Sequence, residues 1–460
     1  MNPRLLLAIG VPVVLVAALL GSTRTSAPPP LFSSGLLGNA TTLLTISLEA
    51  GQTQDAAYVP GSTVLRLADG RLRYLPAGAI EAVTVPAGDP GAAAQIAAER
   101  AWLALGWVPG ASAAERDAAS RSLLFLRLLQ RPGGGVVAAA TPYWAEVWPR
   151  DASFAAAAFG RTGHQQEAGA VLDYLARIQR PDGSWPARAH PDGTPVSDGR
   201  QPELDADGWV CWATWLVSGQ GHDRALAALH WPMVRAAADL AASSLRANGL
   251  PPASPDYWEH HERQPTLGTA AALLTGLRAA ADLAAALGHD QDLRRWAAAA
   301  ERLAAATREA FASPSGTAYH RYPGPASGQT FGLAVAGGPD AAVTWLAPPF
   351  VPPDPRVRRA VARAATQLAP SGAGAVPGLA WTDPWTPATA SFALAETALG
   401  DRAAAARQLG WLLAHRTSLG AFPERVRRAD GAPRSVAPLA WTHAIVLLTL
   451  AEAQHPLPIP

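Results

Sequence analysis

The sequence predicts an all-α fold: an (α/α)6 barrel of about twelve helices, preceded by a small N-terminal β module and an N-terminal hydrophobic export or anchor segment. From about Gly91 onward, apolar residues recur at spacings of three and four, the period of an amphipathic helix. Segments 386–399 and 437–454 are apolar nearly all round, as the inner helices of a closed ring must be. No repeat of fixed length is visible, which disfavours an open solenoid. An ordinary protein of several helical bundles remains the alternative.

The chain divides into three predicted regions: a signal or anchor segment with its tether (1–30), a β-rich module (31–90) and a catalytic barrel (91–460). The apolar segment 5–21 follows Arg4, and its length lies between that of a secretory signal and a full membrane span. A positive charge on the N-terminal side favours export of the rest of the chain. We therefore expect an extracellular location or the outer face of the cytoplasmic membrane, with cleavage and retention as a membrane tether both open.

The module is predicted from short runs that alternate loosely between apolar and polar residues, at 42–48, 62–67 and 72–75. Asp69 and Gly70 between the last two runs offer a hairpin turn. These runs are too few for a full sandwich, so we expect a small sheet.

The barrel is predicted from twelve helical segments, each with an apolar stripe. They are residues 112–130, 151–161, 163–179, 206–218, 228–246, 268–287, 290–312, 339–346, 355–369, 386–399, 401–415 and 437–454. Four connections between them are long and rich in turn residues, at 181–205, 248–267, 316–340 and 417–437. Long connections inside a compact domain usually carry function, and in a helical ring those joining matching helix pairs gather at one mouth.

The composition excludes several function classes. The net charge is +1, so no basic face indicates nucleic acid as a partner. All 37 basic residues are arginine, which excludes a P-loop lysine and a lysine Schiff base. Cys211 is the only cysteine, so neither an intrachain disulfide nor a multi-thiolate metal site can form. His260 and His261 are adjacent and point in different directions, and we expect neither a metal nor a cofactor.

Two glutamates stand beside aromatic or proline residues in distant connections, Glu259 after Trp258 and Glu424 after Pro423. Hydrolysis of a glycosidic bond needs two carboxyl groups, one to protonate the leaving oxygen and one to activate water. The chain also has sixteen tryptophans, several in loops, and indole faces stack on sugar rings. The alternative is that both glutamates are ordinary solvated loop acids.

Three further stretches carry polar and aromatic residues at helix entrances. Trp148-Pro149-Arg150-Asp151 precedes the second helix, where Asp151 could be an N-cap or could join Arg150 as a donor and acceptor for sugar hydroxyls. Asp182-Gly183-Ser184-Trp185 is a turn followed by an indole that we expect to be exposed. Residues 438–443, containing Trp441, open the final helix.

These motifs, in this order from about residue 110 to 455, resemble those of the glucoamylase family of glycoside hydrolases, family 15. The resemblance implies an (α/α)6 barrel that removes glucose from the non-reducing ends of α-glucans with inversion, acting on an oligo- or polysaccharide. It implies that Glu259 is the general acid and Glu424 the general base. The substrate-binding residues that it indicates are Trp148, Arg150, Asp151, Trp185, Trp258 and Trp441.

The sequence departs from the family pattern in two places. The family's paired acids become Glu259-His260-His261-Glu262, and an arginine-tyrosine stretch is shortened to 379–385. Both lie where the second sugar is expected, so action on trehalose or on dextran-type linkages stays open beside glucoamylase-like action. A non-catalytic glycan-binding barrel is the alternative of another class. A phosphorylase is disfavoured, since Glu424 would repel phosphate.

The residues around the two glutamates suggest unequal proton affinities. Trp258 and Tyr257 would partly desolvate Glu259 and keep it protonated, whereas Arg425 would favour the ionised form of Glu424. An inverting enzyme would hold the two carboxyl groups about 6.5–9.5 Å apart, and a separation of about 5 Å would indicate retention.

Overall fold

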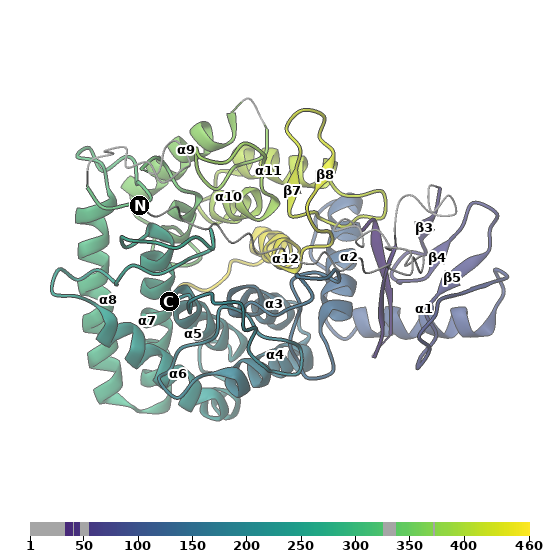
Figure 1. Cartoon of the computed structure of the whole chain (residues 1–460), viewed down its shortest axis with the longest axis horizontal. Coiled ribbons are helices and arrows are strands. Elements are labelled where there is room, and N and C mark those ends of the chain that lie inside the picture. Colours follow the sequence, from purple (N-terminus) through teal and green to yellow (C-terminus); the bar gives the residue numbers. More distant parts are fainter. Residues whose placement is uncertain (1–32, 40, 47–54, 325–336, 371–372) are drawn as a thin grey trace, which may run out of the picture.

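The computed structural model describes residues 33–39, 41–46, 55–324, 337–370 and 373–460 (Figure 1). The expected export or anchor segment 5–21 and its tether 22–30 lie outside the described residues. A large helical lobe forms most of the molecule, and a smaller β-rich lobe projects from one side.

Six helices form a closed inner ring in which each one contacts the next and the last contacts the first. In order they are α3 (Pro149–Arg161), α5 (Asp205–Val217), α7 (Leu267–Leu287), the 3-10 helix η1 (Ala341–Leu346), α10 (Thr386–Ala398) and α12 (Ala440–Gln454). α10 and α12 are buried along most of their length, as their all-round apolar sequence predicts.

Six outer helices surround this ring, and each packs against one or two inner helices. They are α2 (Ala113–Leu129), α4 (Gln165–Ile178), α6 (Arg224–Ser244), α8 (Asp290–Phe311), α9 (Pro355–Leu368) and α11 (Arg402–Ala414). The arrangement is a closed barrel of alternating inner and outer helices, and each of the twelve segments predicted from periodicity is helical.

Local signals set several helix ends. Ser112 and Glu115 form a reciprocal capping box at the start of α2. Thr266 caps α7 by accepting a hydrogen bond from the Thr269 amide at 3.1 Å. The same helix ends at Gly288, whose φ of +83° suits a residue without Cβ.

The segment predicted as an α helix at 339–346 is instead the six-residue 3-10 helix η1. Asp340 starts it by accepting a hydrogen bond from the Ala342 amide at 2.8 Å. Pro348 and Pro349 follow directly and supply no backbone N–H, so the helix cannot continue. One inner position of the ring is therefore filled by a short, tight helix.

The β-rich lobe contains two small antiparallel sheets. One pairs β1 (Gly35–Gly38) with β2 (Leu43–Ile46), and the other is a meander of β3 (Ala57–Tyr58), β4 (Leu65–Arg66), β5 (Leu72–Tyr74) and β6 (Val83–Val85). The predicted turn at Asp69-Gly70 joins β4 to β5, with Gly70 at a φ of +82°. A third pair, β7 (Arg425–Val426) and β8 (Pro433–Arg434), follows Glu424 directly.

One helix was not predicted: α1 (Pro90–Leu103), which packs on β5 and α2. Asp89 caps it, and Glu99 is buried where it accepts a hydrogen bond from the Thr63 amide at 2.6 Å. The lobe is fastened to the barrel by Arg121 of α2, whose guanidinium lies 3.8 Å from the ring centre of Tyr58. The boundary predicted at residue 90, between the β-rich module and the barrel, stays a prediction.

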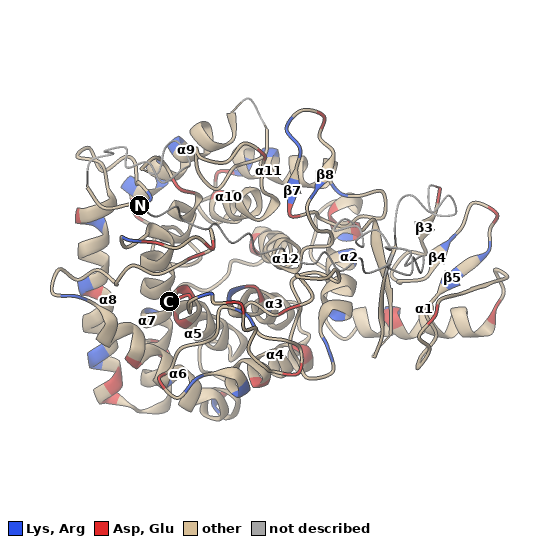
Figure 2. Ribbon diagram, viewed as in Figure 1, with Lys and Arg blue, Asp and Glu red and all other residues tan. Residues whose placement is uncertain are grey.

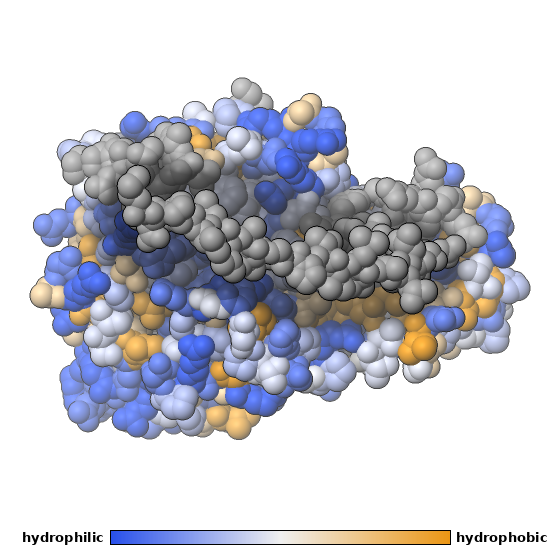
Figure 3. All heavy atoms as spheres, in the orientation of Figure 1, coloured by the Kyte–Doolittle hydropathy of each residue, from blue (hydrophilic) through white to orange (hydrophobic). Residues whose placement is uncertain are grey.

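Surface and core composition fit this architecture. In the view of Figure 2, acidic and basic segments are interspersed rather than gathered on one face, and Figure 3 shows apolar side chains scattered among polar ones. Among the described helices, α7 is long and apolar enough to cross a membrane, but 72% of its apolar window is buried inside the protein. That burial is what an inner barrel helix requires.

Candidate active site

Both predicted catalytic glutamates line one pocket, where the first turns of α3, α10 and α12 meet the long connections. Its free volume is about 30 Å³. The lining residues are Ala138, Trp144, Trp148, Arg150, Asp151, Tyr257, Glu259, Trp385, Pro387, Glu424, Leu439 and Trp441. The predicted convergence of two acids from distant loops is present.

Glu259 is held in an unusual backbone conformation, with a φ of +57°. Its amide donates to the Asp256 carbonyl at 2.6 Å, which closes a tight turn after Trp258. The side chain remains 30% exposed and faces two guanidinium groups. Tyr257 and Trp258 are its predicted neighbours, and the structure adds two cations that lie against the carboxylate.

The first of these cations is Arg200, in the long connection before α5, whose Nη1 contacts Glu259 Oε2. Arg200 also lies 3.3 Å from Asp198, which pairs with the buried Arg188. Arg188 in turn lies 2.9 Å from Glu146, just before the α3 motif. A chain of ion pairs thus connects the proposed acid to the outer wall of the pocket. No sequence motif indicated Arg200.

The second cation is Arg150, which is buried and surrounded by acids. It donates to Glu203 at 2.8 Å and to Asp205 at 2.9 Å, and lies 3.6 Å from Asp151. Its Nη2 is 3.7 Å from Glu259 Oε1. Glu203 and Asp205 stand at the start of α5, which has no side-chain cap, and both acids instead fix the guanidinium.

Burial raises the pKa of the acids around Arg150. For Asp151 the pKa rises to about 7, because desolvation outweighs the attraction of Arg150, with the charge of Glu259 adding to the rise. Burial also raises the pKa of Glu203 and Asp205, against the pull of Arg150. Asp151 is not the N-cap of α3; Trp148 occupies that position and Asp151 points into the pocket lining.

Glu424 follows Pro423 at the start of β7. The Ser435 hydroxyl donates to Glu424 Oε2, and Arg425 Nε lies 3.5 Å from the same oxygen. Burial raises the pKa of Glu424, while the Ser435 hydrogen bond and Arg425 oppose the rise and the charge of Glu259 adds to it. The predicted cationic neighbour is present, but desolvation is the larger effect.

The loop carrying Glu424 is anchored by a buried histidine of α12. The Phe422 amide donates to His443 Nε2 at 3.1 Å, so Nδ1 carries the proton and donates to Ser122 Oγ at 2.8 Å. Burial lowers the pKa of His443 to about 3, so the ring is neutral at physiological pH. His443 thereby ties α2, α12 and the Glu424 loop together.

Aromatic side chains form much of the pocket wall. Trp148 and Trp441, both predicted, line it, and Arg150 lies 5.1 Å from the ring centre of Trp441. Trp144 and Trp385 also line it and were not singled out as site residues, although each stands beside a motif in the sequence. Their position near a helix entrance was the available signal.

Two predicted residues lie outside the pocket lining. Trp185 is 1% exposed and donates from Nε1 to the Leu175 carbonyl at 2.8 Å, so it is a core residue and not an exposed platform. The Asp182–Ser184 turn directs it inward, with Gly183 at a φ of +95°. Trp258 is 7% exposed and stacks under Arg321, 3.8 Å from its ring centre, behind Glu259.

Glu262, the acid in the stretch that departs from the family's paired acids, lies in a buried network of ion pairs. Arg321 donates to Glu262 at 2.6 Å, to Asp256 at 2.8 Å and to Asp340 at 2.8 Å. This buried network supports the loop that presents Glu259. His260 stacks on Trp381 with ring centres 5.6 Å apart, and within the described residues no group of three His, Cys, Asp or Glu is arranged to hold a metal ion.

No protein-family model matches the chain. It is 24% identical over 355 residues to an uncharacterized glycosyl hydrolase of Methanocaldococcus jannaschii, in an alignment covering 72% of this chain and 55% of the relative. The chain therefore spans about half the length of that relative. It is 29% identical over 365 residues to the isomaltose glucohydrolase of Kribbella flavida, covering 70% of this chain and 89% of that protein.

Solved structures share the barrel. A glycosidase in complex with glucose has a TM-score of 0.63 and 23% identity, covering 74% of this chain and 97% of that chain. A bacterial glucoamylase complexed with acarbose has a TM-score of 0.63 and 17% identity, covering 81% of this chain and 62% of that chain. The chain therefore has the helical-barrel fold of glucoamylase-like glycosidases.

Proposed function

We propose that this protein is a glycoside hydrolase, an inverting exo-acting α-glucosidase that releases glucose from short α-glucans. The observation that carries the proposal is that Glu259 and Glu424 line one pocket together with Arg150 and Asp151. Two carboxyl groups in a pocket of indoles and hydrogen-bonding groups match what glycoside hydrolysis requires. The names of both curated relatives, a glycosyl hydrolase and an isomaltose glucohydrolase, support the same class.

In this mechanism Glu259 donates its proton to the glycosidic oxygen as the bond to the anomeric carbon breaks. Glu424 takes a proton from a water molecule, whose oxygen attacks that carbon from the opposite face. Arg150 and Asp151 bind hydroxyl groups of the terminal glucose and fix its orientation. One glycosidic bond is broken and one water molecule is consumed. The hydroxyl from water joins the anomeric carbon, and the leaving oxygen takes the proton from Glu259.

The environment of Glu424 sets one expectation for the pH profile. A general base must be ionised, and burial raises the pKa of Glu424 above its ordinary value. Activity should therefore fall on the acid side at a pH higher than that of an unperturbed glutamate. The hydrogen bond from Ser435 limits this displacement.

The glycosidic linkage is the finer question. The name of the Kribbella flavida relative favours isomaltose, and trehalose, maltose and dextrin are the alternatives. The test is to incubate the purified protein with each of the four substrates and to follow the first anomer of glucose by NMR. Release of β-glucose from an α-linked substrate supports inversion, and release of α-glucose would contradict it.

The role of Glu424 is tested by Glu424→Gln. Loss of a general base typically lowers the rate about 10²–10⁴-fold, so kcat should fall by that order while the fold is kept. Glu452→Gln is the matched control, because Glu452 lies at the far end of α12 and accepts a hydrogen bond from the Leu457 amide. Near wild-type turnover by the Glu424→Gln variant would contradict the assignment of Glu424 as the general base.

A non-catalytic glycan-binding barrel is the second candidate. The contact of Arg200 with Glu259 favours it, since this guanidinium contacts the carboxylate that a glycosidic oxygen would have to reach. Binding of isomaltose or maltose without release of glucose at any pH between 4 and 8 would support this candidate over hydrolysis.

We also propose that the protein is exported and held outside the cytoplasm, with residues 5–21 as leader or tether. The apolar run after Arg4 supports this proposal. Cell fractionation, followed by N-terminal sequencing of the mature chain, distinguishes a cleaved leader from a retained one. Recovery of the intact chain in the cytosol would contradict export.

A further inference from the structure

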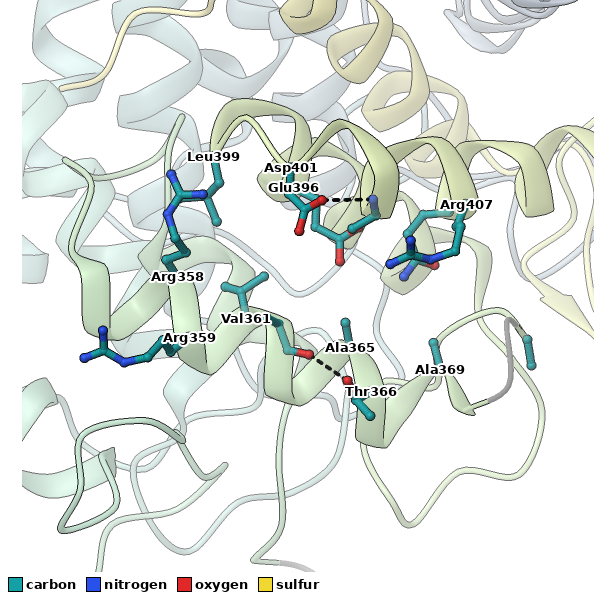
Figure 4. Close-up of a pocket in the computed structure, with 14 residues that line it drawn as sticks. Arg358, Arg359, Val361, Ala365, Thr366, Ala369, Glu396, Leu399, Asp401 and Arg407 are labelled. Atoms are coloured by element: carbon teal, nitrogen blue, oxygen red, sulfur yellow. Dashed lines mark hydrogen bonds between the residues drawn. The ribbon is translucent and has the colours of Figure 1, made fainter.

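A groove on the outside of the barrel lies between α9, α11 and the C-terminal end of α10 (Figure 4). Its free volume is about 570 Å³, within the range of sites for small molecules. It is lined by Arg358, Arg359, Val361, Ala362, Ala365, Thr366, Ala369, Ala373, Glu396, Leu399, Asp401, Ala404, Arg407 and Gln408. None of these residues lines the pocket of Glu259 and Glu424.

The groove has a buried carboxyl group without a partner. Glu396 belongs to the inner helix α10 and is only 4% exposed, yet it lines the outer groove. Its Oε2 has no hydrogen-bond partner among the described residues. Burial raises the pKa of Glu396 to about 7, with Asp401 adding to the rise and Arg407 opposing it. Buried polar atoms in proteins are nearly always hydrogen-bonded, so the position suits a ligand that supplies the bond.

The lining of the groove carries three arginines and two acids. Arg358 and Arg359 come from α9 and Arg407 from α11; in Figure 4 Arg358 and Arg407 flank Glu396, whereas the guanidinium of Arg359 points away from it. Arginine forks bind carboxylates and phosphates through paired hydrogen bonds. Asp401 caps α11 and accepts a hydrogen bond from the Ala404 amide at 3.1 Å, which leaves Arg358 and Arg407 to attract an anion.

The rest of the lining contains no aromatic side chain and combines apolar residues with the polar Thr366, Asp401 and Gln408. Val361, Ala365 and Leu399 provide aliphatic contact for a carbon skeleton. The catalytic pocket differs, because tryptophans there offer stacking faces for a neutral sugar. The outer groove therefore lacks the aromatic stacking faces that an uncharged glucan needs, and it has arginines that bind an anion.

We propose that this groove is a second small-molecule site, which binds an anionic polyol: a sugar acid or a sugar phosphate. Its carboxylate or phosphate pairs with Arg407 at the rim, and one of its hydroxyls bonds to Glu396 at the floor. A hydroxyl both donates and accepts, so it satisfies Glu396 in either protonation state. Val361 and Leu399 cover the carbon chain.

Calorimetric titration of the purified full-length protein tests the proposal with four probes. They are D-glucose 6-phosphate, D-gluconate, inorganic phosphate and D-glucose. We expect the phosphate ester or the sugar acid to bind, and the stronger of the two identifies the anion. Glucose alone and inorganic phosphate alone should bind at least tenfold more weakly, because each makes half of the contacts.

Variants locate the binding. Arg407→Gln should weaken the stronger probe about tenfold, the size of one charge-assisted contact. Arg363→Gln, on the exposed face of α9 outside the groove, is the matched control and should bind as the wild type does. Glu424→Gln should also leave this binding unchanged, which separates the groove from the catalytic pocket. Ala365→Phe, which fills part of the groove, should weaken the stronger probe as well.

Three results would overturn the proposal: no heat from either anionic polyol, equal affinity of the wild type and the Arg407→Gln variant, or loss of binding in the Glu424→Gln variant. Equal binding of inorganic phosphate and glucose 6-phosphate would also overturn it, since the floor carboxyl would then contribute nothing. These outcomes are independent of whether the barrel pocket hydrolyses glucans.

Discussion

Arg200 contacts Glu259 from the solvent side, opposite the buried Arg150, so the proposed acid lies between two guanidinium groups. The two arginines differ in setting: the side chain of Arg200 is 40% exposed, and that of Arg150 is 3% exposed. The buried arginine is fixed by three acids, whereas the exposed one contacts Asp198 and Glu259. A sugar that displaces Arg200 would free Glu259 for its acid role.

Arg200→Gln is expected to lower the KM for the best substrate. Arg200 contacts Glu259, so a sugar that reaches the carboxylate must displace the guanidinium, and the shorter, neutral side chain removes that competition. Arg150, held by Glu203 and Asp205, stays in place beside the other carboxylate oxygen.

The measurement is kcat and KM on the best substrate. KM should fall and kcat should stay, because the bound sugar has displaced Arg200 already. Arg180→Gln, earlier in the same connection and near Asp182, is the control. An unchanged KM in the Arg200→Gln variant would show that Arg200 does not compete with the substrate.

Arg150 and Arg200 should differ in their contribution to stability. Arg150→Met leaves Glu203 and Asp205 buried without their cation, and breaking a buried pair from one side typically costs about 3–5 kcal/mol. Arg200→Gln removes a partly exposed pair and should cost at most about 1 kcal/mol. Urea unfolding at pH 7 measures both free energies. Equal losses would contradict the assignment of Arg150 as the buried centre of the cluster.

Trp185 and Trp441 should separate stability from activity. Trp185→Ala empties a core position and should lower the free energy of unfolding by about 3–5 kcal/mol, with kcat/KM of the folded fraction unchanged. Trp441→Phe keeps most of the volume but alters the pocket wall beside Arg150, so kcat/KM should fall. Steady-state kinetics and thermal unfolding on both variants check this. A fall in kcat/KM of the folded Trp185→Ala variant would contradict the assignment of Trp185 to the core and support its predicted place in the cleft.

His443 should make stability depend on pH between about 6.5 and 3. The folded ring has a pKa of about 3, below its ordinary value of 6.5, so in this window the unfolded chain binds a proton that the folded chain does not. Stability is therefore complete above pH 6.5 and is lost as the pH falls, by up to about 1.4 kcal/mol per pH unit from this group. Other groups add their own slopes.

His443→Gln isolates that contribution, because glutamine does not titrate. The free energy of unfolding, measured in urea at pH 4, 5, 6 and 7, should fall less steeply in the variant than in the wild type. His222→Gln, on an exposed turn, is the control and should keep the wild-type slope. Parallel slopes for the wild type and the His443→Gln variant would mean that the folded ring titrates normally. Since His443 anchors the Phe422 amide, kcat should also fall.

Much of the fold was predictable because its signals are local. Helix periodicity, the Ser112 capping box and the Asp69-Gly70 turn each depend on residues within a few positions of one another. Helix α1 was not predicted, although Asp89 is its N-cap and Pro90 its first residue. The predicted boundary between the β-rich module and the barrel falls at the same place. The segment predicted as an α helix at 339–346 is a 3-10 helix, and the prolines that follow it stop the helix from continuing.

The site was predictable in part. Glu259, Glu424, Arg150 and Asp151 were expected together, and they line one pocket. The burial of Trp185 depends on the direction that a turn gives the chain, and its acceptor, the Leu175 carbonyl, belongs to a helix ten residues earlier. Nothing in the local sequence around Trp185 distinguishes a core indole from an exposed one.

The sequence by itself determined where the helices lie and which acids stand at their entrances, because those features depend on neighbours along the chain. Only the tertiary structure decided which charges meet. Arg200 reaches Glu259 across 59 positions, and Arg150 reaches Glu203 and Asp205 across 53 and 55. Contacts of that range follow from the closure of the helical ring, and burial within the ring then sets which carboxyl groups keep their protons.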